Sequence, residues 1–210
     1  MKWTMNNAWL FCFAVFLTTS CSTPKEVSPS DTLVWCGLDY GKVKMIGTMD
    51  FRQPDKIFPG MLQQWNGLFI KEMYPQIEGM ARSVQTDLQV VDDNNLKASA
   101  SQIDRVDGSR DEMVKNSHIT EGEIADIIRR YQLKREAGLG LVFIMDRLVK
   151  AQATACMYVV FFDISTRKVI LSQRFCDNAG GGGFRNYWFR PIKETVDELP
   201  KLYRRAKTQR

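Results

Sequence analysis

Apolar and polar positions follow strand-like patterns most clearly in the last third of the chain. Three runs, at 139–149, 154–164 and 168–176, are dense in β-branched and aromatic residues, which favours strands. Only residues 165–167 separate the last two runs, so these are predicted to form a hairpin. The run at 154–164 is apolar at nearly every position, which is typical of a central strand that is covered on both faces.

The pattern in the first half predicts two or three strands and one long helix. Residues 32–40 have a strand's apolar and β-rich content, and 42–49 is expected to continue that strand or pair with it. Residues 83–91 alternate in the manner of another strand. Between them, 55–75 places apolar residues at three- and four-residue spacings, which predicts an amphipathic helix that stops before Pro75.

Two further helices are predicted from their start signals. Thr120 and Glu123 have the spacing of a capping box at the head of 120–133. Residues 191–199 are predicted to form a helix with Pro191 at its first position, where the missing N–H has no cost.

These elements predict one α/β domain over 31–207. We expect a mixed, mainly antiparallel sheet packed by about three helices. The polar stretch 92–118 is expected to be a long loop or a small excursion with some structure of its own. Pro200 should kink or split the last helix.

The N-terminus has the composition of a secretion signal. An unbroken apolar run at 8–17 is too short for the roughly 20 residues that span a bilayer, and "TTSC" closes it with small residues and Cys21. We therefore expect a signal peptide at 1–20. "LTTSC" resembles the lipobox of bacterial lipoproteins, in which the cysteine is acylated, and this resemblance implies a lipidated tether at 21–30. Cleavage to a chain without lipid stays open as the alternative.

The positive charge is concentrated at the C-terminus. The chain has 29 Lys and Arg against 24 Asp and Glu. Five of the basic residues lie in the last eleven positions with no acid among them, so the rest is nearly neutral: Lys201, Arg204, Arg205, Lys207 and Arg210. This distribution argues against nucleic acid as a partner. A basic tail is either a solvated helix end or a contact for anionic lipid or polymer.

Three cysteines remain after Cys12 leaves with the signal and Cys21 takes the lipid. If the hairpin loop is 165–167, Cys156 faces Cys176 across the two strands, whereas a register shifted by one residue puts them on opposite faces. No CxxC spacing occurs and there is a single histidine, so we assign no metal and no cofactor.

The most unusual stretch is "NAGGGGFRNYWFRP" at 178–191. One interpretation is a surface recognition patch made of Gly182, Gly183, Phe184, Arg185, Asn186, Tyr187 and Trp188. The other is structural: the glycines let a strand turn into a helix, and the aromatic residues cap the core. A phosphate loop is not supported, because Gly-Lys-Ser/Thr and GxGxxG are both missing. On the structural interpretation, Trp188 should be at least half buried, and Arg185 should point to a carboxylate or to solvent.

Catalytic candidates are limited to carboxylates at the ends of predicted strands. Asp39, Asp50 and Asp163 have this position, where sites form in α/β proteins, yet such aspartates also bind turn amides. His118 has no nucleophile motif around it. We therefore assign no catalytic residue.

Two resemblances add to these expectations. "GLGLVFIMDRLVKAQATACMYVVFFDISTRKVIL", followed by "GGGGFRNYWFRPIK", resembles a family of uncharacterised Bacteroidetes lipoproteins, as does the early "GLDY". Membership implies an exported lipoprotein with one α/β domain and no established activity. At the level of pattern, the C-terminal third is also similar to envelope lipoproteins of the curli-secretion and TolB-amino-domain type, which build assemblies or hold partners.

The expected function is that of a lipid-anchored protein of the cell envelope, on the outer membrane or the periplasmic side. It would act as a non-enzymatic interaction or assembly module with an envelope protein or polymer as its partner. The alternative is an envelope hydrolase or transferase that uses the strand-end carboxylates near the glycine-rich loop.

Overall fold

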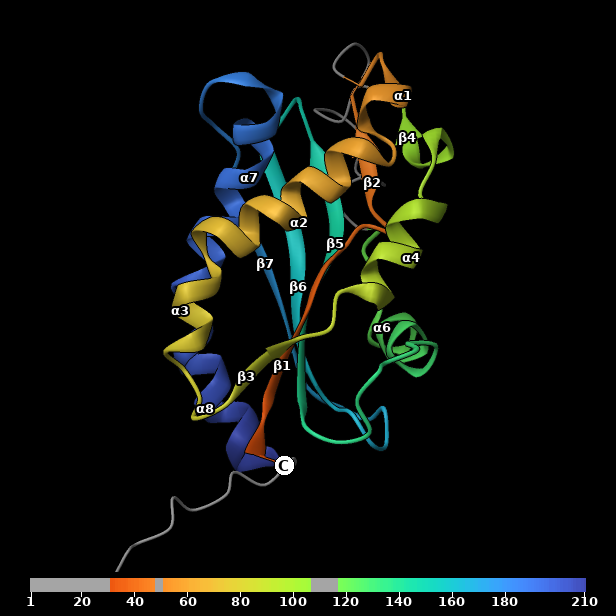
Figure 1. The fold of residues 1–210 in the computed structure, drawn as a ribbon. Coiled ribbons are helices and arrows are strands. Elements are labelled where there is room, and N and C mark those ends of the chain that lie inside the picture. Colours follow the sequence, from red (N-terminus) through yellow and green to blue (C-terminus); the bar gives the residue numbers. More distant parts are fainter. Residues whose placement is uncertain (1–30, 48–50, 107–116) are drawn as a thin grey trace, which may run out of the picture.

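A computed structural model describes residues 31–47, 51–106 and 117–210 (Figure 1). The expected signal and tether, with Cys21, and also Asp50, lie outside this described part. A seven-stranded sheet runs through the described residues. Its strands are β1 (Leu33–Asp39), β2 (Lys44–Ile46), β3 (Val84–Thr86), β4 (Ile103–Asp104), β5 (Leu139–Val149), β6 (Thr154–Asp163) and β7 (Val169–Asn178).

The α/β class is confirmed, but the expected mainly antiparallel sheet with about three helices is wrong. The core strands β3-β1-β5-β2-β4 all pair in parallel. Only the β5–β6 and β6–β7 pairs are antiparallel in the described part. The apolar pattern of a sequence shows where strands lie, but it does not show which strands pair with each other or in which direction. Parallel pairing needs a long crossover connection, which the helices between β1 and β5 provide.

More helices cover the sheet than the three expected. They are α1 (Pro54–Ile57), α2 (Gly60–Glu72), α3 (Tyr74–Glu78), α4 (Gln89–Lys97), α6 (Glu121–Arg129), α7 (Gly183–Val196) and α8 (Leu199–Gln209), with a 3₁₀ turn at Ala100–Gln102. The predicted helix at 55–75 is thus three helices. Pro59 precedes α2 and Pro75 lies in the first turn of α3, because proline is tolerated at a helix start and not in its interior.

Both faces of the sheet are buried. Helices α2, α7 and α8 cover one face of the sheet, and α4 and α6 cover the other (Figure 1). Along β5, Leu141 and Phe143 pack in the first of these cores, whereas Val142 and Ile144 pack in the second. Such two-sided burial explains why β5 is apolar at nearly every position and shows no alternation. The prediction that the run at 154–164 is covered on both faces is confirmed by β6.

Helix boundaries differ most from expectation where short elements meet. The predicted strand at 83–91 ends at Thr86, and Val90 and Val91 instead belong to α4. This helix continues to Lys97, within the stretch 92–118, for which a long loop or a small excursion with some structure of its own is expected. The two valines pack on the sheet beneath α4, and that burial outweighs their β propensity. The capping box is confirmed: Thr120 and Glu123 bond each other's backbone N–H at the start of α6.

The C-terminal helices also divide differently. Pro191 does not begin a helix, because α7 starts eight residues earlier, at Gly183, and carries the proline in its interior. The break expected at Pro200 is confirmed: α7 ends at Val196 and α8 starts at Leu199.

The β6–β7 hairpin has the register that the short loop predicts. Cys156 lies directly opposite Cys176, and the two form a disulfide with a Cα–Cα distance of 4.1 Å. Cys36 is a free, buried thiol, and burial raises the pKa of that thiol well above its ordinary range.

Candidate functional site

The carboxyl end of β1 is held by two buried asparagines from helices on opposite faces of the sheet. Asn66 of α2 accepts from Leu38 N–H at 2.8 Å and donates to the Leu38 carbonyl at 3.0 Å. Asn95 of α4 accepts from Tyr40 N–H at 2.7 Å and also donates to Leu38. Because β3 pairs only with the first half of β1, these side chains satisfy backbone groups that have no neighbouring strand.

Asp39, the last residue of β1, is buried in a closed hydrogen-bond network. Its carboxylate accepts from Tyr131 Oη at 2.6 Å, from Asn94 Nδ2 at 2.8 Å and from Gly41 N–H at 2.7 Å. Burial raises the pKa of Asp39, and these donors together with the charge of Lys42 oppose the rise. The side chain therefore ties the turn after β1 to α4 and to the segment after α6.

Three adjoining cavities, with volumes of about 550, 340 and 320 Å³, open around this turn. Lys42 lines all three, and Lys44, Lys97 and Arg130 each line two of them. All four side chains are exposed. We call this surface, defined by Lys42, Lys44, Lys97 and Arg130, the basic cleft.

Positive charge exceeds negative charge in two of the three cavities. The 550 Å³ cavity has three lysines and one acid, Asp104. The 320 Å³ cavity has two lysines, Arg130 and one acid, Asp39, whose oxygens already accept three hydrogen bonds. Lys97 and Arg130 stand at the ends of α4 and α6, where each helix dipole contributes roughly half a negative charge. Against these four cations, the two acids and the two dipole half-charges leave an excess of about one positive charge, so these two cavities favour anions.

The 340 Å³ cavity is electrically balanced. Its acids are Glu123, Asp126 and Asp146, and each has a partner: Glu123 caps α6, and Asp126 pairs with Arg129. An anion is therefore expected to bind on the side formed by the other two cavities.

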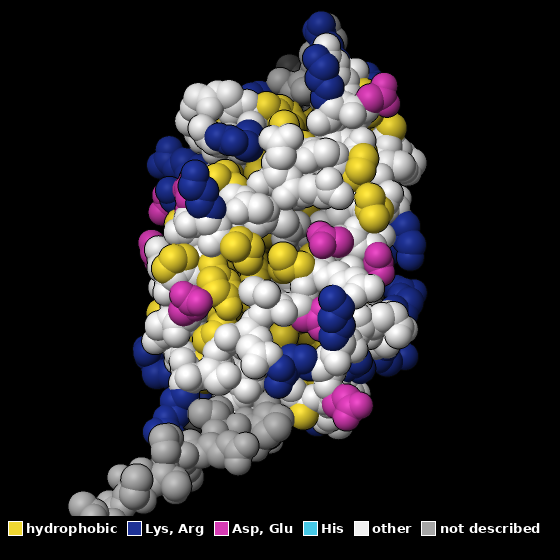
Figure 2. All heavy atoms as spheres, viewed as in Figure 1, with side chains coloured by type: hydrophobic (Ala, Val, Ile, Leu, Met, Phe, Trp, Pro, Cys, Tyr) yellow, Lys and Arg dark blue, Asp and Glu magenta, His cyan; other side chains and the backbone are white. Residues whose placement is uncertain are grey.

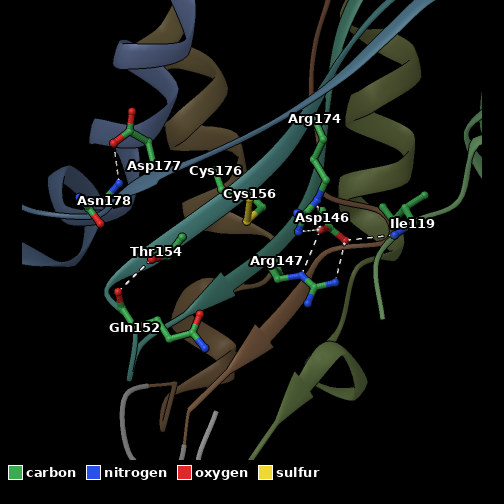
Figure 3. Close-up of a disulfide and its surroundings, with 10 residues drawn as sticks. All are labelled: Ile119, Asp146, Arg147, Gln152, Thr154, Cys156, Arg174, Cys176, Asp177 and Asn178. Atoms are coloured by element: carbon green, nitrogen blue, oxygen red, sulfur yellow. Dashed lines mark hydrogen bonds and ion pairs between the residues drawn. A yellow bond between two sulfur atoms is a disulfide. The ribbon is translucent and has the colours of Figure 1, made fainter. Parts of the chain in front are cut away.

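The wall of the balanced cavity is an ion-pair network beside the disulfide (Figure 3). Asp146 occupies a β-bulge in β5 and contacts Arg147 Nε at 3.0 Å and Arg174 Nη2 at 2.7 Å. It also accepts from Ile119 N–H at 3.3 Å. Asp146 and Arg147 are almost completely buried. Removing one partner of such a pair leaves an uncompensated charge, so the network fixes β5, β7 and the approach to α6 together.

The glycine-rich segment connects β7 to α7. It lies at the open end of the β6–β7 hairpin, where Asn178 is opposite Thr154. Gly182 is the N-cap and Gly183 the first helical residue, and Gly181 and Gly183 have φ angles of +109° and +75°. Arg185 and Asn186 are exposed, and Arg185 Nε donates to Asn186 Oδ1 at 3.3 Å. Arg185 therefore points to solvent, which is one of the two outcomes expected for it.

The aromatic residues of the segment belong mostly to the core. Trp188 is 2 % exposed and stacks on Phe51 with 5.7 Å between ring centroids, which confirms that it is at least half buried. Phe184 and Tyr187 are partly exposed and border a 260 Å³ hollow with Lys150, whose Nζ lies 4.0 Å from the centre of the Tyr187 ring. The recognition interpretation is left with this small hollow and the two exposed polar residues.

The glycine turn also compensates for a proline. Pro191 has no N–H to donate to the carbonyl of Tyr187, four residues earlier in α7. Gly180 N–H donates to that carbonyl at 3.0 Å. The turn therefore folds back on the helix, and this contact gives the run of small residues a structural role.

The strand-end carboxylates do not meet at the glycine-rich loop. Asp163 lies opposite Leu139, at the end of the sheet where β1 starts, while Asp39 lies at the other end of β1. The glycine loop follows Asn178, which is opposite Thr154. The oxygens of Asp163 bond Thr166 N–H at 2.9 Å, the Ser165 and Thr166 hydroxyls, and Arg210.

In 31–47, 51–106 and 117–210, no group of three His, Cys, Asp or Glu side chains is placed to hold a metal ion. Among the helices of the described ranges, none has both the length and the apolar character of a membrane span. Comparisons with protein-family models, with curated proteins and with solved structures find no match to this chain, so the family resemblance stays a prediction.

Sequence reasoning missed the basic cleft. Lys42 and Lys44 directly follow the first strand, which is the position where α/β proteins bind ligands when that strand is parallel to its neighbours. The strand expected within 42–49 is present as β2 (Lys44–Ile46), which pairs with β5, but the strand pattern gave no sign that the lysines of this stretch line a cleft. Lys97 and Arg130 come from distant segments, and only the tertiary fold brings them to the same cavities.

Proposed function

We propose that this protein is a lipid-anchored protein of the cell envelope that holds a phosphate-bearing partner in the basic cleft and does not transform it. The observation that carries the binding part is the cleft itself: four exposed cations from three separate segments line adjoining cavities. Lysine and arginine are the side chains that bind phosphate by charge and by hydrogen bonding.

The disulfide supports an exported protein. Disulfides form and persist in oxidising compartments such as the periplasm and the cell surface. Cys156 and Cys176 are joined across neighbouring strands, in a chain whose first 20 residues have the composition of a signal peptide. Cys21 then supplies the anchor, and each methylene of its acyl chains would add about 0.8 kcal/mol of membrane affinity.

Fractionation of two cysteine variants tests the anchor. After a high-salt wash, which screens contacts between exposed charges, the Cys21→Ser chain should leave the membrane fraction and appear in the soluble fraction. The Cys12→Ser chain is the matched control, because that cysteine lies within the expected signal, and it should stay with the membrane. A Cys21→Ser chain that remains bound as firmly as the wild-type chain would reject the lipid attachment.

Titration with pyrophosphate tests the cleft. A cleft variant with Lys42, Lys44, Lys97 and Arg130 all changed to Gln should bind pyrophosphate at least tenfold more weakly, and wild-type affinity should fall as salt rises. The control neutralises four exposed cations of α8 by the same change: Lys201, Arg204, Arg205 and Lys207. If both variants lose the same amount of pyrophosphate affinity, the binding depends on net charge, and the cleft is not a specific site.

The hydrolase or transferase alternative has less support in this arrangement. It needs carboxylates near the glycine-rich loop, and Asp39 and Asp163 lie at opposite ends of β1's path along the sheet. Turnover of ester or phosphate substrates by the wild-type chain, lost in Asp39→Asn, would overturn the binding proposal.

A further inference from the structure

Helix α8 has one apolar face and one basic face. Leu199, Leu202 and Ala206 are buried against the core. The cations on the exposed side, which we call the α8 basic face, are Lys201, Arg204, Arg205 and Lys207. At 100° per residue, these four positions span roughly 160° of the helix circumference, opposite the buried residues. Figure 2 shows Lys and Arg side chains along the lower left of the molecule, where Figure 1 places α8.

The helix dipole does not explain this distribution. Cations suit the last turn of a helix, and acids suit the first. Lys207 fits that rule, but Lys201 and Arg204 lie in the first half of α8, and its first turn contains no acid. The basic face therefore points to an external anionic partner.

The end of α8 lies beside the start of β1, where the chain enters the domain (Figure 1). Arg210 pairs with Asp163 at 3.2 Å, and Asp163 lies opposite Leu139, which is paired with Leu33. Burial raises the pKa of Tyr203 in α8, and the nearby negative charge of Asp31 raises it further. These contacts place residue 31 and the α8 basic face at the same end of the molecule.

The chain between the expected anchor and the domain is short. Nine residues separate Cys21 from Asp31, and a fully extended chain gains at most about 3.6 Å per residue. An acylated Cys21 would thus hold the start of β1, and α8 with it, within roughly 35 Å of the membrane surface. No other helix of the described part combines this position with a basic, acid-free exposed face.

We infer that the α8 basic face docks on anionic lipid headgroups of the membrane that holds the anchor. The inference rests on the proposed lipid anchor for its geometry and deepens it, because the contact orients the domain. The basic cleft lies at the carboxyl end of β1, the end opposite α8, so docking turns the cleft away from the membrane. Each basic residue close to an anionic leaflet strengthens binding roughly fivefold.

Vesicle binding of the full chain carrying Cys21→Ser tests the contact without the acyl group. Vesicles of phosphatidylcholine alone are compared with vesicles that contain one third phosphatidylglycerol. The chain should bind the anionic vesicles and not the neutral ones. Changing Lys201, Arg204, Arg205 and Lys207 to Gln should weaken that binding by roughly several hundredfold, whereas the cleft variant, with the same loss of charge, should keep it.

Two further measurements make each outcome decisive. Gln has nearly the helix propensity of Lys and Arg, so the melting temperature of the α8 variant should match the wild-type value. If it does not, the double variant Lys201→Gln, Arg204→Gln should still bind anionic vesicles roughly 25-fold more weakly than the parent chain. Equal binding to neutral vesicles, or loss in the cleft variant alone, would overturn the inference. If mass spectrometry finds Cys21 of the wild-type chain without lipid while the vesicle binding is as predicted, the proposed anchor is contradicted and the α8 contact is not.

Discussion

At the residue scale, a few buried polar side chains shape the end of β1. Asn66 and Asn95 hold the backbone from both faces, and Asp39 closes the turn through three donors. A buried carboxylate is costly unless hydrogen bonds compensate it. This network therefore sets the position of Lys42, which lies three residues after Asp39.

Tyr131→Phe tests this network, because it removes one donor to Asp39 and leaves the ring in place. The free energy of unfolding should fall by about 1–3 kcal/mol, the cost of a buried charged acceptor that loses a partner. Chemical denaturation measures this loss, with Tyr158→Phe as the control, since that hydroxyl donates to the neutral Ile119 carbonyl. An equal or smaller loss in Tyr131→Phe would show that Asp39 does not depend on the phenol.

Asp163 should make stability depend on acid. Burial alone would raise its pKa, but hydrogen bonds from Ser165 and Thr166 and the charge of Arg210 outweigh burial and lower the pKa from 3.8 to about 2. A lowered carboxyl pKa stabilises the fold above the unfolded-state value, and that stabilisation disappears as pH falls through about 2. The stability difference between the wild-type chain and Asp163→Ala should therefore shrink between pH 5 and pH 2. A stability difference that stays constant over this pH range would show that the ionised carboxylate of Asp163 does not stabilise the fold.

At the element scale, the glycine-rich turn and α7 act as one unit. The turn supplies the N–H that Pro191 lacks, and Trp188 anchors the helix in the core. A Cβ on Gly182 or Gly183 would meet no atom within 4 Å. The backbone conformation at these two glycines, and not crowding, therefore limits which residues can replace them.

Two matched substitutions separate conformation from crowding. Gly183 has a φ of +75° and Gly182 a φ of −81°. Gly183→Ala should destabilise the chain by about 1 kcal/mol or more, because L-residues disfavour positive φ, while Gly182→Ala should change the melting temperature little. Equal effects of the two substitutions would reject this account of the turn.

The disulfide should stabilise the hairpin and the sheet edge. It closes a loop with a sequence separation of 20 residues, for which the loss of chain entropy in the unfolded state corresponds to about 3 kcal/mol. Changing Cys156 and Cys176 together to Ser should lower the free energy of unfolding by roughly that amount in denaturant titrations. Unchanged stability, together with free thiols in the wild-type protein, would contradict the bond.

Elements with long, dense patterns could be predicted from the sequence, and short ones could not. The strands β5, β6 and β7 and the Cys156–Cys176 register follow from apolar runs and a short loop. Local pattern fails at Val90 and Val91, whose β propensity is overridden by packing on the sheet, and at Pro191, whose missing hydrogen bond is compensated from outside the helix. Parallel pairing has no local signal at all.

At the scale of the whole molecule, the two basic surfaces lie at opposite ends of β1. The α8 basic face could be recognised as a charge run in the sequence, whereas the cleft could not, because its four cations are scattered between residues 42 and 130. In the proposed orientation, α8 meets the membrane and the cleft faces the partner. Anchoring at Cys21 is the condition on which this arrangement depends.

Intact-mass and peptide mass spectrometry of the protein extracted from its own membrane tests that condition most directly. We predict a mature chain that begins at Cys21 and carries a diacyl or triacyl modification, with Cys156 and Cys176 recovered as one linked peptide pair. A mature chain that retains residues 1–20, or one that begins at or after residue 21 without lipid, would contradict the account of a lipid-anchored envelope protein.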